Sequence, residues 1–495
     1  MSNTENGRLM RIQAALEARG CSLASEVNPK TPVYRDMVYT PESRVCFSRN
    51  PCFTGRETEL EAMREALLGC TQVLVTGPGG SGKTQLALEY AHRYGDAYRC
   101  VRWIPARTET ALLRAYADLA VDARLASRYS ASAPRDVTNW MTKQRDCLFI
   151  YDDVEDVDAL IKWMQHDYRY MRQNPQKCHI ILTTRLDQVH YNQVYYWKKI
   201  EAVPFTQEEA AEFLQKRTGL PDCGEARELA SRLGYFPLSL SLMAAAVRDI
   251  LGGFAAAMTI LPAALEGDHQ KGLEAATRLA LRRLGGKADR NTATLLYLCA
   301  HLAPENLLPE MMSAFFSDTV PRERFQALAE LGLMRPQAMG GYTMPRPVQA
   351  FILELLEEKE VWANHVLRVL RGCYTYAPRA NDAFLMLSPH VEAFVAAATG
   401  ILKTPESRMG LSALCVTRGV GFERLSYWAL AVEGYKQALA LRKKTPAMES
   451  EETSLIYYHI ALAYERMSKR SLAASWHKKA TELREKLLGP EPPNK

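Results

Sequence analysis

Residues 77–84 read GPGGSGKT, which matches the phosphate-loop pattern G-x-x-x-x-G-K-[ST] at every defined position. The apolar run 73–75 before the loop predicts a strand, and residues 85–91 (QLALEYA) after it predict a helix. Glycines let such a loop turn its backbone N–H groups toward a polyphosphate, and the N-terminus of the next helix then faces the anion. A chance glycine-rich turn lacks this context, so the stretch predicts a site for a nucleoside triphosphate or diphosphate.

The residue types in the loop predict what individual residues do. Lys83 is predicted to reach the β- and γ-phosphates, and the Thr84 hydroxyl is predicted to enter the coordination shell of Mg²⁺. The predicted cofactors are therefore ATP or ADP with Mg²⁺. The residues of this stretch predicted to bind them are Gly77, Pro78, Gly79, Gly80, Ser81, Gly82, Lys83, Thr84 and Gln85.

Two further apolar runs end in charged residues. The run 147–151 leads into Asp152 and Asp153, and we expect the first acid to hold Mg²⁺ and the second to polarise the attacking water. The alternative is that paired aspartates cap a turn or a helix. The run 179–182 leads through two threonines to Arg185, which is predicted to sense the γ-phosphate, the alternative being a surface arginine.

The pattern along the chain predicts α/β structure followed by helices. Short apolar runs at 73–75, 100–104, 147–151 and 179–182 alternate with helical segments, which indicates a parallel sheet. Residues 206–265 are predicted to be helical, beginning with a capping box between Thr206 and Glu209. A hairpin across 339–342 suggests a winged-helix module, and helix follows helix from 361 onward.

An internal repeat is visible near the C-terminus, with a period of 42 residues. Residues 422–426 (FERLS) align with 464–468 (YERMS). The same offset relates Ala431 to Ala473 and Ala438 to Ala480. These small residues at fixed positions predict stacked helical hairpins similar to tetratricopeptide repeats, with a concave face for a protein or peptide. The alternative is a helical bundle with accidental similarity, because only two copies are clear.

Composition narrows the class of protein. The chain has 495 residues, 47% hydrophobic and 24% charged, with a formal net charge of +6. These ordinary globular values demand neither nucleic acid nor membrane. Eleven scattered cysteines without a C-x-x-C pair predict reduced thiols and no zinc site. No signal-peptide pattern or long apolar stretch is found, so we expect a cytoplasmic protein, with the nucleus as the alternative.

The order of these motifs resembles the NB-ARC family of signal-transduction ATPases, also called STAND or AP-ATPases, over about residues 50–360. The stretches that carry the resemblance are FTGRE (53–57), GPGGSGKTQLALEYA (77–91), YDDVED (151–156), ILTTR (181–185) and GYFPL (234–238). The subgroup fused to tetratricopeptide repeats is the most similar, because GKTQLALEYA, the segment 389–391 and the 42-residue repeats all match it. By this resemblance Phe53, Thr54 and Arg56 frame the adenine and Pro237 closes the base pocket.

The resemblance implies a division of the chain into six parts. The expected parts are an N-terminal extension (1–50), a P-loop nucleotide-binding domain with a parallel sheet (51–203), a helical domain (204–268), a winged-helix domain (269–360), a helical connector (361–414) and tetratricopeptide-like repeats (415–495). The first part is too short for an effector domain with its own core.

The chain departs from the family in its winged-helix segment. Relatives carry there a histidine that contacts the β-phosphate of ADP, whereas this chain has Pro345, followed by Arg346. A proline side chain cannot donate a hydrogen bond. Arg346 is the candidate replacement, and we predict that it binds the cofactor.

The expected function is a nucleotide-dependent switch with weak, slow ATP hydrolysis, used in signal transduction of the kind found in innate immunity. Its repeats would receive a protein or peptide partner, and activation would change its conformation or produce a homo-oligomer. One alternative is a scaffold that holds nucleotide without hydrolysing it. Another is a transcription regulator, since Arg278, Arg282, Arg283 and Lys287 have helical spacing, although a solvated basic face explains them more simply.

Overall fold

The fold is described from a computed structural model of the whole chain. The described residues are 48–70, 72–125, 132–157, 160, 178–185, 197–261, 268–284, 290–312, 315–316, 322–337, 341–376, 381–443 and 445–488. The short N-terminal helix that the sequence suggests at residues 9–16 lies outside them. Within these ranges no single helix is long and apolar enough to cross a membrane, and the bent pair Pro237–Leu251 and Phe254–Ile260 passes that test only when taken together.

The first half of the described chain forms a five-stranded parallel sheet in the order β2-β3-β4-β1-β5. The strands are β1 (Gln72–Thr76), β2 (Cys100–Pro105), β3 (Cys147–Val154), β4 (Cys178–Thr184) and β5 (Lys198–Glu201). The first four are the predicted ones, and their parallel pairing is confirmed. The fifth was missed because it reads KKIE, in which only Ile200 is buried.

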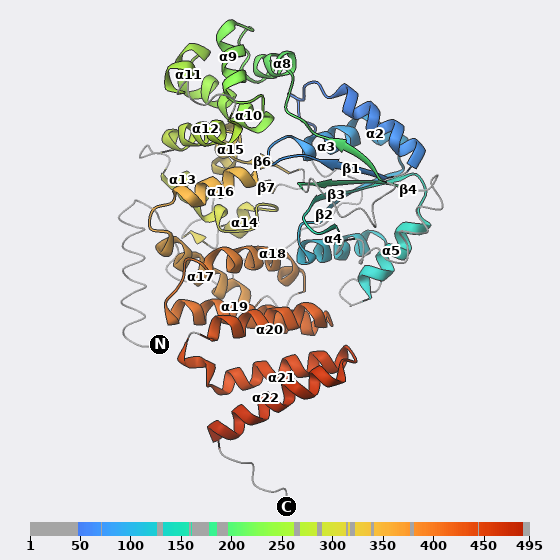
Figure 1. The fold of residues 1–495 in the computed structure, drawn as a ribbon, viewed down its shortest axis with the longest axis vertical. Coiled ribbons are helices and arrows are strands. Elements are labelled where there is room, and N and C mark those ends of the chain that lie inside the picture. Colours follow the sequence, from blue (N-terminus) through green and yellow to red (C-terminus); the bar gives the residue numbers. More distant parts are fainter. Residues whose placement is uncertain are drawn as a thin grey trace, which may run out of the picture.

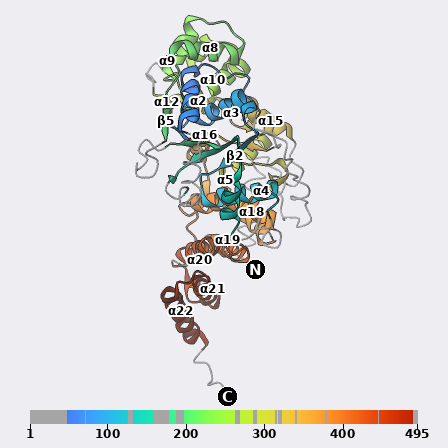
Figure 2. The ribbon, with the colours of Figure 1, turned by 90° about the vertical axis from the view of Figure 1, so that its right-hand side faces the viewer.

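Helices cover both faces of the sheet (Figures 1 and 2). Alternate residues of each strand point to opposite faces, so β3 sends Leu148 and Ile150 to one side and Phe149 and Tyr151 to the other. The first side packs against α2 (Glu57–Cys70) and α3 (Lys83–Tyr94), and the second against α4 (Glu109–Asp122) and α5 (Ala133–Lys143). This continuous burial explains why these strands read as unbroken apolar runs.

A helical region follows the sheet, as predicted for residues 206–265. It begins with the expected capping box, in which Thr206 and Glu209 satisfy each other's backbone N–H groups. The Glu209 carboxylate also accepts a bond from the backbone N of Arg56, so it ties this region to the start of the sheet domain. The helices within that range are α8 (Gln207–Thr218), α9 (Gly224–Arg232), α10 (Pro237–Ala246), a π-helical turn (Val247–Leu251) and α11 (Phe254–Ile260). The next helix, α12 (His269–Arg283), belongs to the predicted winged-helix part and packs against α10.

The next region surrounds a small hairpin. Strands β6 (Arg335–Pro336) and β7 (Tyr342–Thr343) pair in antiparallel fashion, which confirms strands on both sides of the predicted turn, although residues 338–340 are outside the described chain. The helices are α13 (Arg290–Ala300), α14 (Pro309–Met312), α15 (Arg322–Glu330) and α16 (Arg346–Leu355). That this region is a winged-helix domain stays a prediction.

Helices make up the remainder of the described chain. They are α17 (Lys359–Tyr376), α18 (Asn381–Ala398), α19 (Pro405–Arg424), α20 (Trp428–Arg442), α21 (Glu451–Arg466) and α22 (Arg470–Leu488). The helices pack in order as two hairpins, α19 with α20 and α21 with α22, and the hairpins stack through α20 and α21 (Figure 1). The predicted start of the repeats at residue 415 falls within α19, so the first hairpin begins at Pro405.

The two hairpins repeat in their hydrogen bonds as well as in sequence. Ser412 donates to the carbonyl of Ala438 at 3.2 Å, and Ser454 donates to the carbonyl of Ala480 at 2.9 Å, across the same separation of 26 residues. The stack is open at α22: Leu472 is 43% exposed, whereas Leu430, its equivalent on α20, is 2% exposed. The 42-residue period is therefore a repeat of three-dimensional structure.

The alanines at the hairpin contacts provide a test of the repeats. Ala438 is fully buried, so we expect Ala438→Leu to overpack the hairpin and lower the free energy of unfolding by about 1 to 3 kcal/mol. Ala440→Leu, at an exposed position of the same helix, should cost little. Chemical denaturation measures both. If Ala438→Leu also abolishes nucleotide binding, the repeats are part of the nucleotide site and not a separable surface.

Candidate nucleotide site

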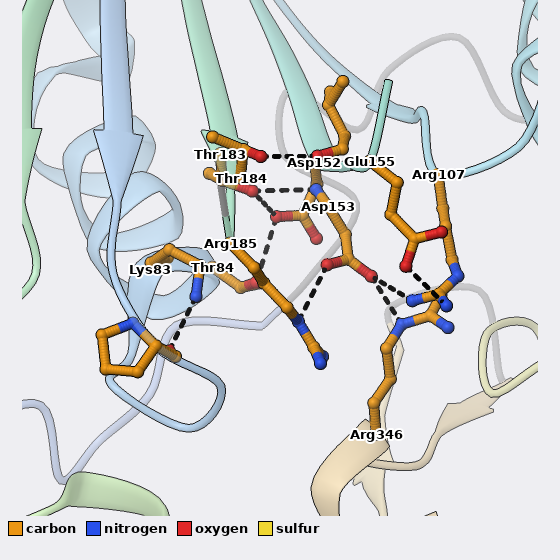
Figure 3. A network of polar contacts seen from close by, with 12 residues as sticks. Lys83, Thr84, Arg107, Asp152, Asp153, Glu155, Thr183, Thr184, Arg185 and Arg346 are labelled. Carbon is orange, nitrogen blue, oxygen red and sulfur yellow. Dashed lines mark hydrogen bonds and ion pairs between the residues drawn. The ribbon is translucent and has the colours of Figure 1, made fainter. Parts of the chain in front are cut away.

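The phosphate-loop sequence lies between β1 and α3, at the carboxyl edge of the sheet. Glycine is required where the loop turns: Gly77 has φ 143° and a Cβ there would lie 2.7 Å from the carbonyl oxygen of Ala202. Gly80 has φ 87° and faces the side chain of Leu238. The Lys83 ammonium donates to the carbonyls of Gly77 and Pro78 at 2.7 and 2.8 Å, so it lies over the loop (Figure 3).

Two helix N-termini close on the loop. At the start of α10, the backbone N of Leu238 donates to the Gly80 carbonyl at 3.3 Å, and Pro237 lies against Gly82. At the start of α16, Pro347 lies against Gly79. The loop is thus held between the helical region and the region around the hairpin. Pro237, predicted to close the base pocket, is at the loop, whereas its contact with a base stays a prediction.

The paired acids stand beside the loop at the end of β3. The Thr84 hydroxyl donates to Asp152 at 3.0 Å, and the Thr183 hydroxyl donates to the same carboxylate oxygen at 2.6 Å (Figure 3). Burial, together with the charge of Asp153, raises the pKa of Asp152 to about 6. A hydroxyl and a half-buried carboxylate side by side are the hard oxygen donors that Mg²⁺ prefers, so the residues present fit the predicted metal.

Asp153 has an unusual backbone. The pairing of β3 with β4 is irregular between Tyr151 and Val154, and Asp153 adopts φ 59°, which is uncommon for a residue with a side chain. Its backbone N donates to the Thr183 hydroxyl at 2.8 Å. As a result the carboxylates of both acids reach the same site instead of opposite faces of the sheet (Figure 3). Such local strain is typical of functional positions.

Three arginines surround the Asp153 carboxylate. Arg346 is the closest at 2.5 Å, and Arg185 and Arg107 each lie at 3.5 Å (Figure 3). Burial on its own would raise the pKa of Asp153, but the three guanidinium groups outweigh it and lower the pKa. Asp153 is therefore held as a carboxylate whose charge is fully engaged.

Arg346 connects this carboxylate to the hairpin region. It is the first residue of α16, where a cation is disfavoured by the helix dipole, and two carboxylates hold it there. Besides Asp153, it binds Glu305 at 2.6 Å. Burial raises the pKa of Glu305, so this carboxyl group depends on its arginine partner to remain charged. The sequence assigned Arg346 to the cofactor. In the structure Arg346 pairs with these two acids, and its contact with nucleotide stays a prediction.

The remaining predicted residues divide between the loop and its surroundings. The Arg56 guanidinium donates to the carbonyls of Ser81 and Val203, so it supports the loop from behind. Phe53 lies near Arg93, in the last turn of α3, and the Thr54 hydroxyl bonds to the Cys52 carbonyl. Whether these three residues frame an adenine stays a prediction.

Gln85, also predicted to bind the cofactor, follows Thr84 on α3. Its side-chain oxygen accepts a hydrogen bond from the amide of Asn50 at 3.0 Å, which joins the start of the described chain to α3. Arg185 faces the site, because its guanidinium lies near both Gly79 and Asp153.

Sequence reasoning missed four residues of the site: Arg107, Glu155, Thr183 and Glu305. Thr183 and Glu155 stand within the stretches ILTTR and YDDVED, so their neighbours could have drawn attention to them. Arg107 pairs with Glu155 at 2.6 Å and also with Asp153. It lies just after β2, where the sequence around it matches no known motif. Glu305 is far from the sheet residues of the site in the sequence. It reaches the site because it pairs with Arg346 at the start of α16.

The parallel sheet, the phosphate loop and the acids at the end of β3 define a P-loop nucleotide-binding protein. Residues 56–221 match the family model described as the NB-ARC domain, so this part of the chain is an NB-ARC domain. No curated protein matches the chain.

Solved structures show more distant similarity. A STAND protein with a tetratricopeptide repeat sensor from Pyrococcus horikoshii is 15% identical, with 91% of this chain and 79% of that chain covered and a TM-score of 0.47. A Walker-type ATPase of Pyrococcus abyssi is 16% identical, covering 64% of this chain and 99% of that chain, with a TM-score of 0.33. At these values the structures define no function for this chain.

Proposed function

We propose that this protein is an ATP- and ADP-binding switch of the NB-ARC type that hydrolyses ATP slowly and couples partner recognition by its repeats to a conformational change. The observation that carries the proposal is the arrangement at the carboxyl edge of the sheet. There Lys83 lies over the loop, and Thr84 and Asp152 form a pair suited to Mg²⁺.

The arginines on Asp153 favour a switch over a constitutive enzyme. A general base must be free to accept a proton, and the charge of Asp153 is engaged by Arg346, Arg185 and Arg107. Since Arg346 belongs to α16, movement of α16 away from the sheet would release the carboxylate. The conformation described here is therefore proposed to be the closed, hydrolysis-poor state.

The repeats offer a surface for a partner. Three side chains on the first helices of the two hairpins are 40% to 53% exposed although apolar or aromatic: Val420, Leu455 and Tyr458. Leu455, Tyr458 and the half-buried Leu462 follow helical spacing along one face of α21. The repeat relates them to Ala413, Val416 and Val420 on α19. A continuous stripe of this kind fits a protein or peptide segment with apolar side chains.

A buried arginine joins the repeats to the sheet domain. Arg418 of α19 is 1% exposed and donates to the Thr110 hydroxyl, near the start of α4, at 3.4 Å. It also pairs with Glu392 of α18 at 3.2 Å. Contact of the repeats with α4 gives a partner bound on the stripe a physical route to the domain that holds the nucleotide.

The test begins with the nucleotide that the protein carries. We expect mass spectrometry of the ligand released from freshly purified protein to find ADP or ATP, and calorimetry on stripped protein to show binding that requires the phosphate loop. If hydrolysis is undetectable while binding is tight, the nucleotide acts as a structural cofactor and the scaffold function replaces the switch. Absence of binding would reject both.

The role of Asp153 is tested by Asp153→Asn. The amide keeps the shape of the side chain but cannot accept the proton of the attacking water, so hydrolysis should slow by roughly 10²- to 10⁴-fold. ATP and Mg²⁺ binding, measured by calorimetry, should stay near normal because Thr84 and Asp152 are unchanged. Collapse of Mg²⁺-dependent binding would mean that the two acids have exchanged roles.

A further inference from the structure

Three cysteines face one another across the sheet, away from the nucleotide. In the strand register Cys100 of β2 is opposite Cys147 of β3, and Cys147 is opposite Cys178 of β4. Opposite residues of parallel neighbours point to the same face, and all three contribute to the core between the sheet, α4 and α5. We call these residues the cysteine row. All three are free thiols.

The thiols of the row are close enough to interact. A hydrogen bond with the Cys147 thiol, together with burial, raises the pKa of Cys100, and a hydrogen bond with the same thiol lowers the pKa of Cys178. The hydrogen bond with Cys100 lowers the pKa of Cys147, but Cys178 and burial outweigh it and raise that pKa to about 11. The Cys147 thiol also donates to the carbonyl of Arg145 at 3.5 Å, and the Cys178 thiol to that of Gln144 at 3.5 Å. The strand register places Cys147 between its two neighbours on one face of the sheet.

Strand spacing decides which pairs can form a disulfide. Neighbouring strands lie about 4.7–4.9 Å apart, within the Cα separation of about 4.4–6.8 Å that a disulfide spans. A disulfide also needs the two Cβ atoms about 3.5–4.5 Å apart, so one strand has to move slightly toward the other when the bond forms. Cys100 and Cys178 are separated by an intervening strand, so their separation is roughly twice as large and exceeds this limit. The row can therefore hold one disulfide at a time, and that disulfide must include Cys147.

The solvent exposure of the two neighbouring cysteines and their positions in the sheet indicate which of them forms the disulfide with Cys147. Cys147 is fully buried and Cys178 is 3% exposed, whereas Cys100 is half-buried. Cys100 also lies on β2, an edge strand, where the backbone can adjust more easily than in the middle of the sheet. We propose that the cysteine row is an oxidation site, at which a peroxide converts Cys100 and Cys147 into a disulfide that ties β2 to β3.

The reaction balances with hydrogen peroxide as the oxidant. The Cys100 sulfur, as thiolate, attacks the peroxide; an S–O bond forms, the O–O bond breaks, and hydroxide leaves and takes up a proton to become water. The Cys147 sulfur then attacks the sulfenic sulfur, forming the S–S bond and releasing the second water. The two thiols lose two electrons and two protons, and the peroxide is reduced to two waters. Because the pKa of Cys100 is raised, little thiolate is present and the reaction should be slow.

The bridge would lie at the amino end of β3, whereas Asp152 and Asp153 lie at its carboxyl end. A strand rises about 3.3 Å per residue, so five residues separate the row from Asp152 by roughly 17 Å. The proposal therefore does not depend on the proposed function, and nucleotide binding should be equal in the reduced and oxidised forms.

The experiment compares the full chain after treatment with hydrogen peroxide and after treatment with a reductant. Free thiols are alkylated in denaturant, and the digested protein is analysed by mass spectrometry. We expect a peptide pair joined through Cys100 and Cys147, lighter by two hydrogens than the separate thiols, and a higher melting temperature for the oxidised form, since the bridge constrains the unfolded chain.

Single-cysteine variants test which two cysteines form the disulfide. Cys147→Ser and Cys100→Ser should each abolish the joined peptides and the rise in melting temperature, and Cys100→Ser serves if Cys147→Ser fails to fold. Cys178→Ser should retain both effects, as should Cys299→Ser, whose thiol is buried and has its pKa raised by burial alone. Recovery of Cys147 as a free thiol after peroxide treatment would overturn the proposal, as would a bridge between Cys147 and Cys178.

Discussion

Replacement of Lys83 by alanine is expected to weaken ATP binding by roughly 10- to 150-fold. The ammonium lies over the phosphate loop, and a charge-assisted hydrogen bond contributes about 1.5–3 kcal/mol, which corresponds to that change in affinity. In the present conformation Lys83 donates to the carbonyls of Gly77 and Pro78, so a bound phosphate has to attract it away from them. Titration calorimetry with ATP and Mg²⁺ measures the loss.

A matched control separates the local effect from a general change of charge. Lys198 is an exposed lysine of β5, in the same sheet, and Lys198→Ala should leave ATP affinity unchanged. If Lys83→Ala and Lys198→Ala bind ATP equally well, the loop does not hold the nucleotide and the proposed function fails.

The second large effect is expected from Arg346→Ala. Arg346 is 14% exposed and bridges Asp153 to Glu305, so its removal leaves two partly buried carboxylates without their closest partner. Breaking a fully buried pair typically costs about 3–5 kcal/mol. Partial exposure of these groups, and the two arginines that remain on Asp153, make the expected loss smaller than that. We expect a clear fall in melting temperature together with faster ATP hydrolysis, because Asp153 loses the closest of its three arginines and α16 is no longer tied to the sheet. Single-turnover hydrolysis and calorimetric unfolding measure the two effects.

Two companion variants sharpen this result. Arg346→Lys keeps a charge but not the guanidinium fork that reaches both acids, so its melting temperature and hydrolysis rate should fall between those of the wild type and Arg346→Ala.

Pro345→His restores the family's hydrogen-bond donor and should raise ADP affinity, by roughly 5- to 150-fold for about 1–3 kcal/mol, without changing ATP affinity. If Arg346→Ala lowers ADP affinity strongly and Pro345→His changes nothing, Arg346 contacts the nucleotide in the ADP-bound state.

Features that depend on neighbouring residues in the sequence could be predicted. The loop and four strands follow from local pattern, since a phosphate loop has a fixed spacing and a strand buried on both faces is an unbroken apolar run. The capping box at Thr206 and Glu209 likewise spans a single helical turn. The 42-residue repeat was visible because equivalent positions pack in equivalent ways.

The contacts of the acids could not be predicted in the same way. Asp153 is positioned by a strand irregularity and by arginines that follow β2, follow β4 and begin α16, and no spacing in the sequence links those three places. Glu305 depends on the same packing. The short strand β5 escaped notice for a different reason, because its pairing with β1 needs only backbone groups and its side chains are mostly charged.

The equivalence of the two hairpins has a consequence for how such a chain can change in length. The bonds of Ser412 and Ser454 show that the two hairpins are closed in the same way, and Leu472 on α22 is the exposed equivalent of the buried Leu430 on α20. A duplicated 42-residue unit inserted after residue 488 would bury Leu472 and extend the apolar stripe by one step. Gene duplication could therefore alter the reach of the partner surface in whole units while the sheet domain stays the same.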